Sequence, residues 1–266
     1  EFCGRVANTS RGQDGKRLGL RVSVMRTKVP LFFFLLASLM AGAAAAGEFW
    51  QEKQYRRWSE RECRKLLADS PWAKRYVVGR AIVELLGRVD PVRAGEPSAQ
   101  MEYQVRLLSA LPIRQAMVRL AQLNQKYDQM PSEKQQAFDQ QVENFVAASF
   151  VETVVVDVAY RANMQVHARE MAYYWQSQTA DTLKNRVFLL AGRGLRIPPL
   201  DYIPAEGGGG FRLVFPRQYE GQPLVSQQDK KLQLEFPHPN IQEQGEVRVL
   251  IEFDVKKMLL NGEVIY

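Results

Sequence analysis

The sequence has few of the residues from which catalytic and metal sites are most often built. Its 266 residues include two histidines and two cysteines, and Cys3 lies far upstream of the other three residues. One remaining cysteine with two histidines cannot build a Cys/His zinc site of the usual kind. No His-Glu-x-x-His, Gly-x-Ser-x-Gly, Ser-x-x-Lys or Walker-type phosphate loop occurs. We therefore assign no catalytic residue, no metal ligand and no cofactor from the sequence.

Long hydrophobic runs are also scarce, and the exception is the stretch from Val29 to Ala46. Met25 begins a segment with two early basic residues, an apolar centre at Leu31 to Met40 and a small-residue exit, which are the features of a secretory signal peptide. We predict a signal peptide over 25–46, cleaved near Ala46/Gly47. The protein is then expected in the periplasm or outside the cell.

The alternative for this stretch is a retained membrane helix, because its length approaches the roughly 20 residues that span a bilayer. Alanines crowd its distal end and no basic cluster follows directly, which favours cleavage. A lipoprotein anchor is disfavoured because no cysteine follows the small residues. We expect residues 1–24, which are basic and have little apolar content, to be disordered or a non-native upstream segment.

A strong net charge is absent from the part that we expect to fold. The whole chain has 36 basic and 29 acidic residues, but beyond residue 46 these numbers become 29 and 27. The basic excess belongs mainly to the upstream part, so we expect no nucleic-acid partner. Cys63 is the one cysteine left after cleavage, and we favour a buried small hydrophobe over a site of intermolecular pairing.

A helix start is clearly marked after residue 58. Ser59 and Glu62 have the spacing of a capping box, and Trp58 with Cys63 has that of a hydrophobic staple. Ser70-Pro71 should end this helix. We expect Trp58 and its neighbouring aromatic residues to pin the helix to the core rather than to stack on a ligand.

This stretch resembles a known motif. The run from Trp58 to Ala73, of the form Trp-Ser-x-x-Glu-x-x-Lys-Leu-Leu-x-Asp-Ser-Pro-Trp-Ala, is similar to the amino-terminal motif of a group of uncharacterised exported bacterial proteins. That group pairs the motif with an α+β body and a later Phe-Pro-Arg stretch, here Phe215-Pro216-Arg217. The resemblance implies export and an α+β fold. It carries over no catalytic residue.

The pattern of hydrophobic residues predicts an α+β fold with two domains, at 47–180 and 181–266. The first should combine helices and a sheet, and the second, with short strands separated by turns, should be an antiparallel β-sandwich-like part. The alternative is that the two parts share one hydrophobic core. In the first part we expect strands at Tyr76 to Leu86, Met101 to Leu107 and Phe150 to Tyr160, a loop at Gly87 to Ala99, and helices from Pro112, from Ser132 and over Asn163 to Gln178.

The sequence also predicts two further helix starts and one turn. Ser132 and Gln135 repeat the capping-box spacing. Asp254 is expected to cap a short helix, and Asn261-Gly262 to turn the chain into its last residues.

Few side chains suggest a site. His167 and Glu170 would share a helical face, and we interpret them as a solvated or hydrogen-bonded pair rather than metal ligands. His238 lies between two prolines and is expected in an exposed loop. The four glycines 207–210 lack the Lys-Ser/Thr and helix start of a phosphate loop and are expected to form a flexible loop. Arg212 and Arg217 are expected to be ordinary solubilising residues.

The leading functional hypothesis is an exported, non-enzymatic binding or structural component of the cell envelope, whose partner is a protein or an envelope component. A first alternative is an envelope hydrolase with a dispersed site, drawing on His167 with Asp157 or Glu170. A second is an accessory subunit of a membrane-associated assembly, which would contact the membrane only through an uncleaved 25–46 segment.

Overall fold

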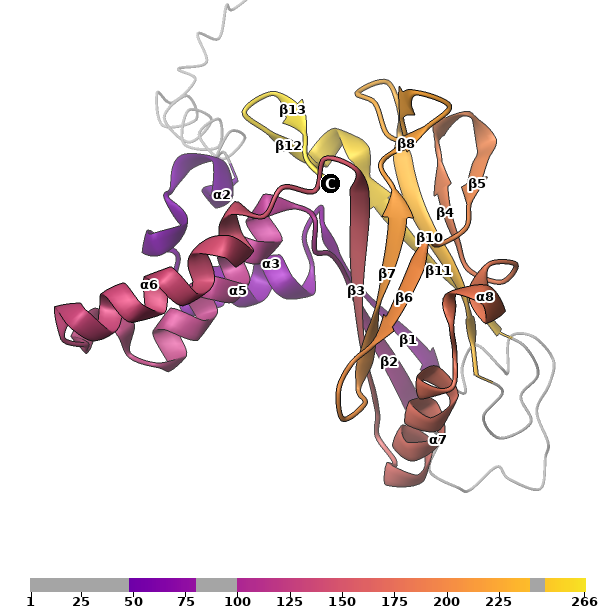
Figure 1. Cartoon of the computed structure of the whole chain (residues 1–266), viewed down its shortest axis with the longest axis horizontal. Coiled ribbons are helices and arrows are strands. Elements are labelled where there is room, and N and C mark those ends of the chain that lie inside the picture. The colour runs from indigo at the N-terminus through magenta and orange to yellow at the C-terminus, as the bar shows by residue number, and fades with distance from the viewer. Residues whose placement is uncertain (1–47, 80–99, 240–246) are drawn as a thin grey trace, which may run out of the picture. The chain divides into compact units, whose positions relative to one another are not determined.

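A computed structural model of the chain describes residues 48–79, 100–239 and 247–266 (Figure 1). The expected signal peptide at 25–46, the upstream segment 1–24, the end of the strand predicted to reach Leu86 and the loop predicted at Gly87 to Ala99 lie outside the described residues. Gly47–Tyr266 forms one compact unit. The description that follows concerns this unit alone.

The larger sheet has five antiparallel strands. Its order is β1-β2-β3-β7-β6, and buried and less buried residues alternate along β2, as the sequence predicts for a strand with one wet face. Strand β3 lies at the centre of this sheet and overlaps the strand expected at Phe150 to Tyr160, with one of its faces partly exposed. The bounds are β1 Ala73–Gly79, β2 Gln100–Leu107, β3 Thr153–Ala162, β6 Asp201–Pro204 and β7 Gly210–Pro216.

A second sheet of four antiparallel strands has the order β11-β10-β4-β5. Its bounds are β4 Phe188–Ala191, β5 Leu195–Ile197, β10 Lys231–His238 and β11 Val247–Asp254. Two small hairpins complete the strands, with β8 Gln218–Tyr219 paired to β9 Gln222–Pro223 and β12 Leu259–Leu260 paired to β13 Glu263–Val264. Helices with antiparallel sheets confirm the predicted α+β class.

The core lies where the two sheets meet. Tyr103 on β2 packs edge-on against Phe236 on β10, with ring centroids 5.0 Å apart. Phe211 on β7 lies 6.1 Å from the same Phe236 ring. Such edge-to-face contacts are favourable for aromatic rings. These rings belong to a single cluster of buried residues that draws on both sheets.

Residue 180 is therefore not a boundary between separate cores, which corrects the expected division at 47–180 and 181–266. Strand β3 precedes residue 180 and pairs with β7, which follows it. Together with β6, this places two late strands in the sheet begun by β1, β2 and β3. The change of pattern near residue 180 reflects shorter elements. Local pattern does not report which strands share a sheet.

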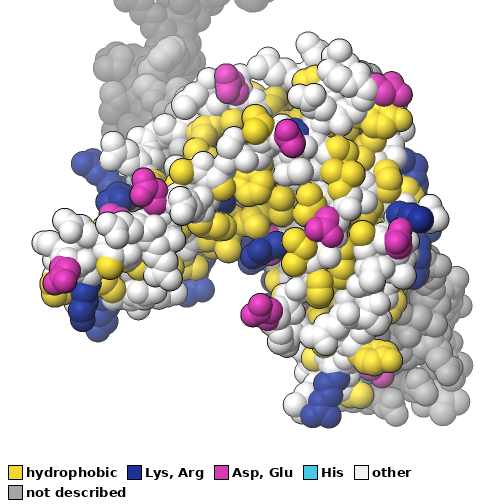
Figure 2. Space-filling model, viewed as in Figure 1, with side chains coloured by type: hydrophobic (Ala, Val, Ile, Leu, Met, Phe, Trp, Pro, Cys, Tyr) yellow, Lys and Arg dark blue, Asp and Glu magenta, His cyan; other side chains and the backbone are white. Residues whose placement is uncertain are grey.

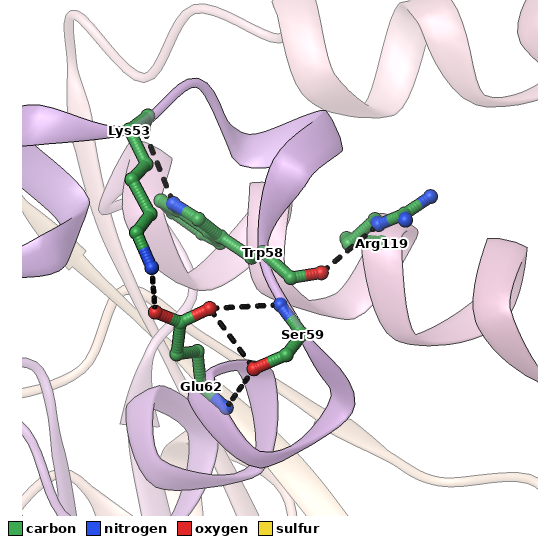
Figure 3. Close-up of polar contacts among 5 residues, drawn as sticks. All are labelled: Lys53, Trp58, Ser59, Glu62 and Arg119. Carbon is green, nitrogen blue, oxygen red and sulfur yellow. Dashed lines mark hydrogen bonds and ion pairs between the residues drawn. The ribbon is translucent and has the colours of Figure 1, made fainter.

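Helix α3, Glu60–Ala68, begins with the predicted capping box (Figure 3). The Glu62 backbone N–H donates to Ser59 Oγ at 3.3 Å, and the Ser59 backbone N–H donates to the Glu62 carboxylate at 2.8 Å. Lys53 Nζ lies 2.5 Å from the same carboxylate and, with the Ser59 amide, lowers the pKa of Glu62. Cys63, Leu66 and Leu67 are buried, as predicted for one face of this helix.

Trp58 joins this helix to its neighbours (Figure 3). Its indole Nε1 donates to the Lys53 carbonyl at 3.2 Å, and its own carbonyl accepts from Arg119 Nε at 3.1 Å. The side chain is 1% exposed, which supports a packing role for the aromatic residues here. The short elements before α3 are α2 Phe49–Glu52 and the 3₁₀ turn η1 Tyr55–Arg57.

Two longer helices follow β2, with α5 at Leu111–Asn124 and α6 at Ser132–Ala147, joined through the 3₁₀ turn η3 at Tyr127–Gln129. The capping box predicted at Ser132 is not formed. Pro131 occupies the N-cap position without a side-chain hydrogen bond, and Ser132 is the first helical residue. The spacing is satisfied by the sequence, but the helix begins one residue too early for Ser132 to cap it.

Arg114 ties the start of α5 to the end of α6. One terminal nitrogen donates to the Ser109 carbonyl at 2.7 Å, and the other donates to Val146 and Ala148 carbonyls at 3.3 and 3.1 Å. The last carbonyls of a helix lack partners within it, so a cation there is favourable. The segment between α6 and β3 is held by this buried side chain.

Helix α7, Gln165–Gln176, lies at the edge of the core and confirms the helix expected within Asn163 to Gln178. Its Trp175 ring stacks on Phe211 of β7 at 4.1 Å and meets Phe236 of β10 edge-on at 5.9 Å. It therefore contacts both sheets. The remaining short helices are α8 Ala180–Leu183, η4 Gly192–Gly194 and η6 Val255–Lys257, the last capped by Asp254 as predicted.

The two serines at capping-box spacing give a matched test. Ser59→Ala should lower the free energy of unfolding by about 1 kcal/mol, because the Glu62 amide loses its acceptor. Ser132→Ala should change it by less than about 0.5 kcal/mol, since Ser132 caps nothing. Urea unfolding of both variants and the parent would measure this. Equal losses in the two variants would contradict the assigned helix starts.

Candidate functional site

Two lines of charged residues cross the face of the larger sheet that points away from the core, which we call the outer face. In the first line Arg106, Asp157 and Arg212 lie in register on β2, β3 and β7. Asp157 Oδ2 is 3.3 Å from Arg106 Nη1, and Oδ1 is 3.5 Å from Arg212 Nε. Each oxygen of one carboxylate therefore meets a different guanidinium group.

The second line repeats the arrangement farther along the strands. Glu102 on β2 is in register with Arg161 on β3, and Arg161 Nη2 lies 2.9 Å from its Oε2. Arg75 on β1 reaches the same oxygen at 3.7 Å. Here too one carboxylate serves two arginines. The outer face thus carries an excess of positive charge in both lines.

Between the two lines runs a middle row, in which Arg75, Gln104, Ala159 and Gly210 are in register across β1, β2, β3 and β7. Its side chains on β3 and β7 are small. A Cβ atom at Gly210 would meet the Val158 carbonyl at 2.7 Å, so the close approach of the strands requires glycine there. At Ala159 and Gly210 the sheet surface is therefore lower than the charged lines on either side.

Two hollows, of about 540 and 430 Å³, occupy this surface and share Ala159 as a lining residue. We call them together the groove. On the side shown in Figure 2, the surface between the helices and the sheets is hollowed, and hydrophobic side chains gather in it. The groove is lined on its helical side by Arg64, Leu67, Ala68 and Leu120, in its middle by Arg75, Glu102, Gln104, Arg106 and residues 157–161, and at its far end by Ile203 to Glu206 and Gly208 to Arg212.

Backbone carbonyls at the end of α3 hold the groove in place. Gln104 Nε2 donates to the carbonyl of Ala68 at 3.0 Å, and Arg106 Nε donates to that of Leu67 at 2.9 Å. Both acceptors belong to the last turn of the helix, which attracts donors and cations. The floor and one wall of the groove are therefore fixed before any ligand arrives.

The groove is basic. Its lining includes five arginines and three carboxylates, those of Glu102, Asp157 and Glu206. The arginine side chains stay accessible, at 73% exposed for Arg161 and 49% for Arg212. A guanidinium group has five N–H donors in a planar fork, and pairing with one carboxylate leaves donors open to solvent. The groove can therefore accept anionic groups.

His238 does not lie in an exposed loop, and that expectation is wrong. It is the last residue of β10, is 3% exposed, and its Nδ1 is 2.8 Å from the Tyr103 hydroxyl on β2. The flanking Pro237 misled the prediction. Strand β10 pairs with β4 only as far as Glu235, so Pro237 lies where one edge of β10 is free and no amide is needed.

Burial sets the protonation of this pair. It raises the pKa of Tyr103 well above its usual range and lowers the pKa of His238 to about 4. The phenol therefore keeps its proton, the imidazole stays neutral at physiological pH, and the hydroxyl and Nδ1 share one hydrogen bond. The hydrogen bond joins the two sheets, so we interpret His238 as structural.

His167 forms the predicted hydrogen-bonded pair with Glu170, at 3.0 Å between Nδ1 and Oε2, although the ring is buried rather than solvated. The alternative pairing of His167 with Asp157 does not occur, because Asp157 is held between two arginines on the outer face. Within residues 48–79, 100–239 and 247–266, no group of three or more Cys, His, Asp or Glu could hold a metal ion.

The other residues singled out from the sequence have mostly structural roles. Gly207, Gly208 and Gly209 all have positive φ and form the turn from β6 to β7, with no phosphate-loop geometry. Arg212 lies in the groove. Arg217 is not an ordinary exposed residue, since it donates to the Phe150 carbonyl at 3.1 Å and stacks over Tyr266 at 4.2 Å.

Cys63 is a buried free cysteine with no exposed surface, as expected for a small core residue. Burial raises the pKa of its thiol to about 11. The thiol is therefore neither ionised nor accessible in the folded protein. This favours the structural role over intermolecular pairing.

None of the described helices is both long enough and apolar enough to span a membrane. No family model, curated protein or solved structure matches this chain. The groove is therefore the feature of this protein from which a function can be inferred.

The groove was not predicted from the sequence, although the sequence does show part of the pattern that forms it. Charged or polar residues alternate with apolar ones at Glu102, Gln104 and Arg106, and the charged Asp157 and Arg161 lie on the same face as Ala159 between them. The alternation predicts a wet face on each strand. It does not predict that β2, β3 and β7 are neighbours, or their register.

A pH experiment tests the state of His238. In the fold the ring stays neutral down to about pH 4, while the unfolded chain takes up a proton below about pH 6.5. The free energy of unfolding should thus fall as pH decreases from 6.5 toward 4. Between pH 7 and pH 5 the parent should lose about 2 kcal/mol more than His238→Gln, measured by urea unfolding. Identical pH dependence in the two proteins would contradict a buried neutral imidazole.

A labelling experiment tests Cys63. In a Cys3→Ser background, a thiol reagent such as DTNB should leave Cys63 unmodified in the native protein and modify it fully in denaturant, because only unfolding exposes the thiol. Absorbance at the wavelength of the released thiolate gives the extent. Fast modification under native conditions would show that Cys63 is not buried.

Proposed function

We propose that this protein is an exported, non-enzymatic binding component of the cell envelope, which holds its partner in the groove. The observation that carries the proposal is the chemistry of the groove lining. It includes guanidinium donors, three carboxylates, a carboxamide, one tyrosine and apolar side chains, but no histidine, serine, threonine, cysteine or lysine. Such a surface can bind charged groups, and it lacks the histidine, serine, cysteine and lysine side chains that most often act as bases or nucleophiles.

Two of the three carboxylates of the groove, those of Asp157 and Glu102, are already paired with arginines. Both oxygens of Asp157 face arginines, and Glu102 is shared between Arg75 and Arg161. A general base needs an oxygen within reach of the proton that it removes. Here the oxygens already accept from protein donors, which favours a positioning role for both acids.

The two histidines give no support to the hydrolase alternative. His238 is enclosed between the sheets with Tyr103, and His167 is buried on α7 beside Glu170. Neither lines the groove. Within the lining, an acid/base site would be left with Glu206, an exposed carboxylate on the β6–β7 turn.

Export supports an envelope location for this binding role. The sequence of residues 25–46 has the three regions of a signal peptide. Its cleavage near Ala46/Gly47 would release the compact unit Gly47–Tyr266. The motif beginning at Trp58 is also similar to that of exported bacterial proteins.

Photo-crosslinking in cells of the natural host tests this proposal. Ile203 lines the groove and is 45% exposed, while Leu250 is 47% exposed on β11 of the other sheet. A photoreactive phenylalanine analogue at 203 should give cross-linked products in the envelope fraction, and the same residue at 250 should give few. The processed protein should show no turnover in a broad hydrolase screen.

Three outcomes would contradict the proposal. Products that form equally from positions 203 and 250 would remove the groove from the binding role. An unprocessed chain that stays in the cytosol would exclude export. Robust turnover by the purified processed protein would make it an enzyme.

A further inference from the structure

We infer that the ligand of the groove is an extended, acidic peptide segment of a partner protein, lying across the strands of the larger sheet. This inference rests on the proposed binding function and adds the chemical class of the partner. It is drawn from the direction, length, charge and floor of the groove.

The groove runs across the strands rather than along them. Its middle row passes from Arg75 on β1 through Gln104, Ala159 and Gly210, and the Ala205 amide beside β6 donates to the Gly210 carbonyl at 3.0 Å. Five strands at a spacing of about 4.8 Å give a length of about 19 Å. An extended chain rises about 3.3 Å per residue, so about six residues fit.

The charges of the two walls suit acidic side chains. Alternate side chains of an extended peptide point to opposite sides, so acidic residues would meet both charged lines. Arg161 belongs to one line and Arg212 to the other, and each contacts its carboxylate through a single nitrogen. The remaining N–H donors can hold a ligand carboxylate in the forked geometry that arginine favours.

The floor suits a peptide backbone better than a phosphate group. Gln104 Nε2 is committed to the carbonyls of Ala68 and Lys74, which leaves the amide oxygen as an acceptor for a ligand N–H. A phosphodiester or a fully ionised phosphate group has no such donor. The apolar side chains of Leu67, Leu120 and Ile203 also line the groove and can contact apolar parts of a peptide.

The form of the groove disfavours a membrane surface. Its floor is at Ala159 and Gly210, between lines of long charged side chains, with the end of α3 at one side and the β6–β7 turn at the other. A peptide is narrow enough to reach this floor. A planar bilayer would touch only the outer ends of the arginines.

The test measures binding of a fluorescein-labelled octaglutamate peptide to the full chain by fluorescence anisotropy. The double variant Arg161→Gln/Arg212→Gln should weaken binding at least tenfold, because it removes one open guanidinium group from each wall. The matched control is Arg248→Gln, which removes an arginine that is 48% exposed and pairs with Glu235 on the other sheet. It should change affinity by less than about twofold. Added salt should weaken binding to the parent.

The other arms decide between ligand classes. Octaglutamine should bind at least tenfold more weakly than octaglutamate, and tripolyphosphate or phosphatidylglycerol vesicles should not displace octaglutamate at equal anion concentration. Thermal unfolding of the double variant, expected to match that of Arg248→Gln, excludes a general loss of folding. Binding that survives in the double variant, equal binding of octaglutamine, or binding of phosphate probes in place of octaglutamate would each overturn the inference.

This result can be separated from a failure of the proposed function. If octaglutamate does not bind while position 203 still gives cross-linked products, the groove binds something else and only the acidic-peptide inference fails. If the products at position 203 are also absent, the proposed function fails with it.

Discussion

The register of β2, β3 and β7 is the constraint on which the rest of this structure depends. Tyr103, Tyr160 and Phe211 face the core because of it, while Arg106, Asp157 and Arg212 line up on the other side. Side chains alternate between faces with a period of two, so a slip of one residue would exchange the two sets. Such a slip would move the charged side chains into the core, away from water, and would expose the aromatic rings to solvent. The burial of the core therefore also builds the charged groove.

Arginines that donate to backbone carbonyls hold the helices to one another and to the larger sheet. Arg106 holds the last turn of α3, Arg114 the end of α6, and Arg119 the Trp58 carbonyl before α3. Arg114 is 5% exposed, and its burial together with the nearby Arg217 cation lowers its pKa. Several carbonyl dipoles offset the free-energy cost of burying this charge. In many other proteins a buried arginine is paired with a carboxylate instead.

Local features of the fold could be predicted from the sequence. Four of them depend only on neighbours within a few residues. These are the capping box at Ser59, the alternation along β2, the existence of strand β3, and the turn at Asn261-Gly262. Their physics is complete within a short window, which is why pattern suffices.

The features that were predicted wrongly, or not at all, depend on contacts between residues far apart in the sequence. His238 is buried because Tyr103, 135 residues away, faces it across the two sheets. The division near residue 180 failed because β3 pairs with β7, and the groove because its lines of charge cross three strands. Strand order and register are set by which surfaces pack together, and one sequence does not encode them in any local pattern.

The contacts of Arg114 have a consequence for the conditions under which the protein can work. Its acceptors are neutral carbonyls in a dry interior, so dissolved ions have little access to them and little effect on the attachment of α6. The guanidinium groups of the groove, by contrast, face the medium. If the groove binds the ligand that we propose, a rise in ionic strength would weaken that binding and leave the attachment of the helices unchanged, so the ligand would be released without any change of shape.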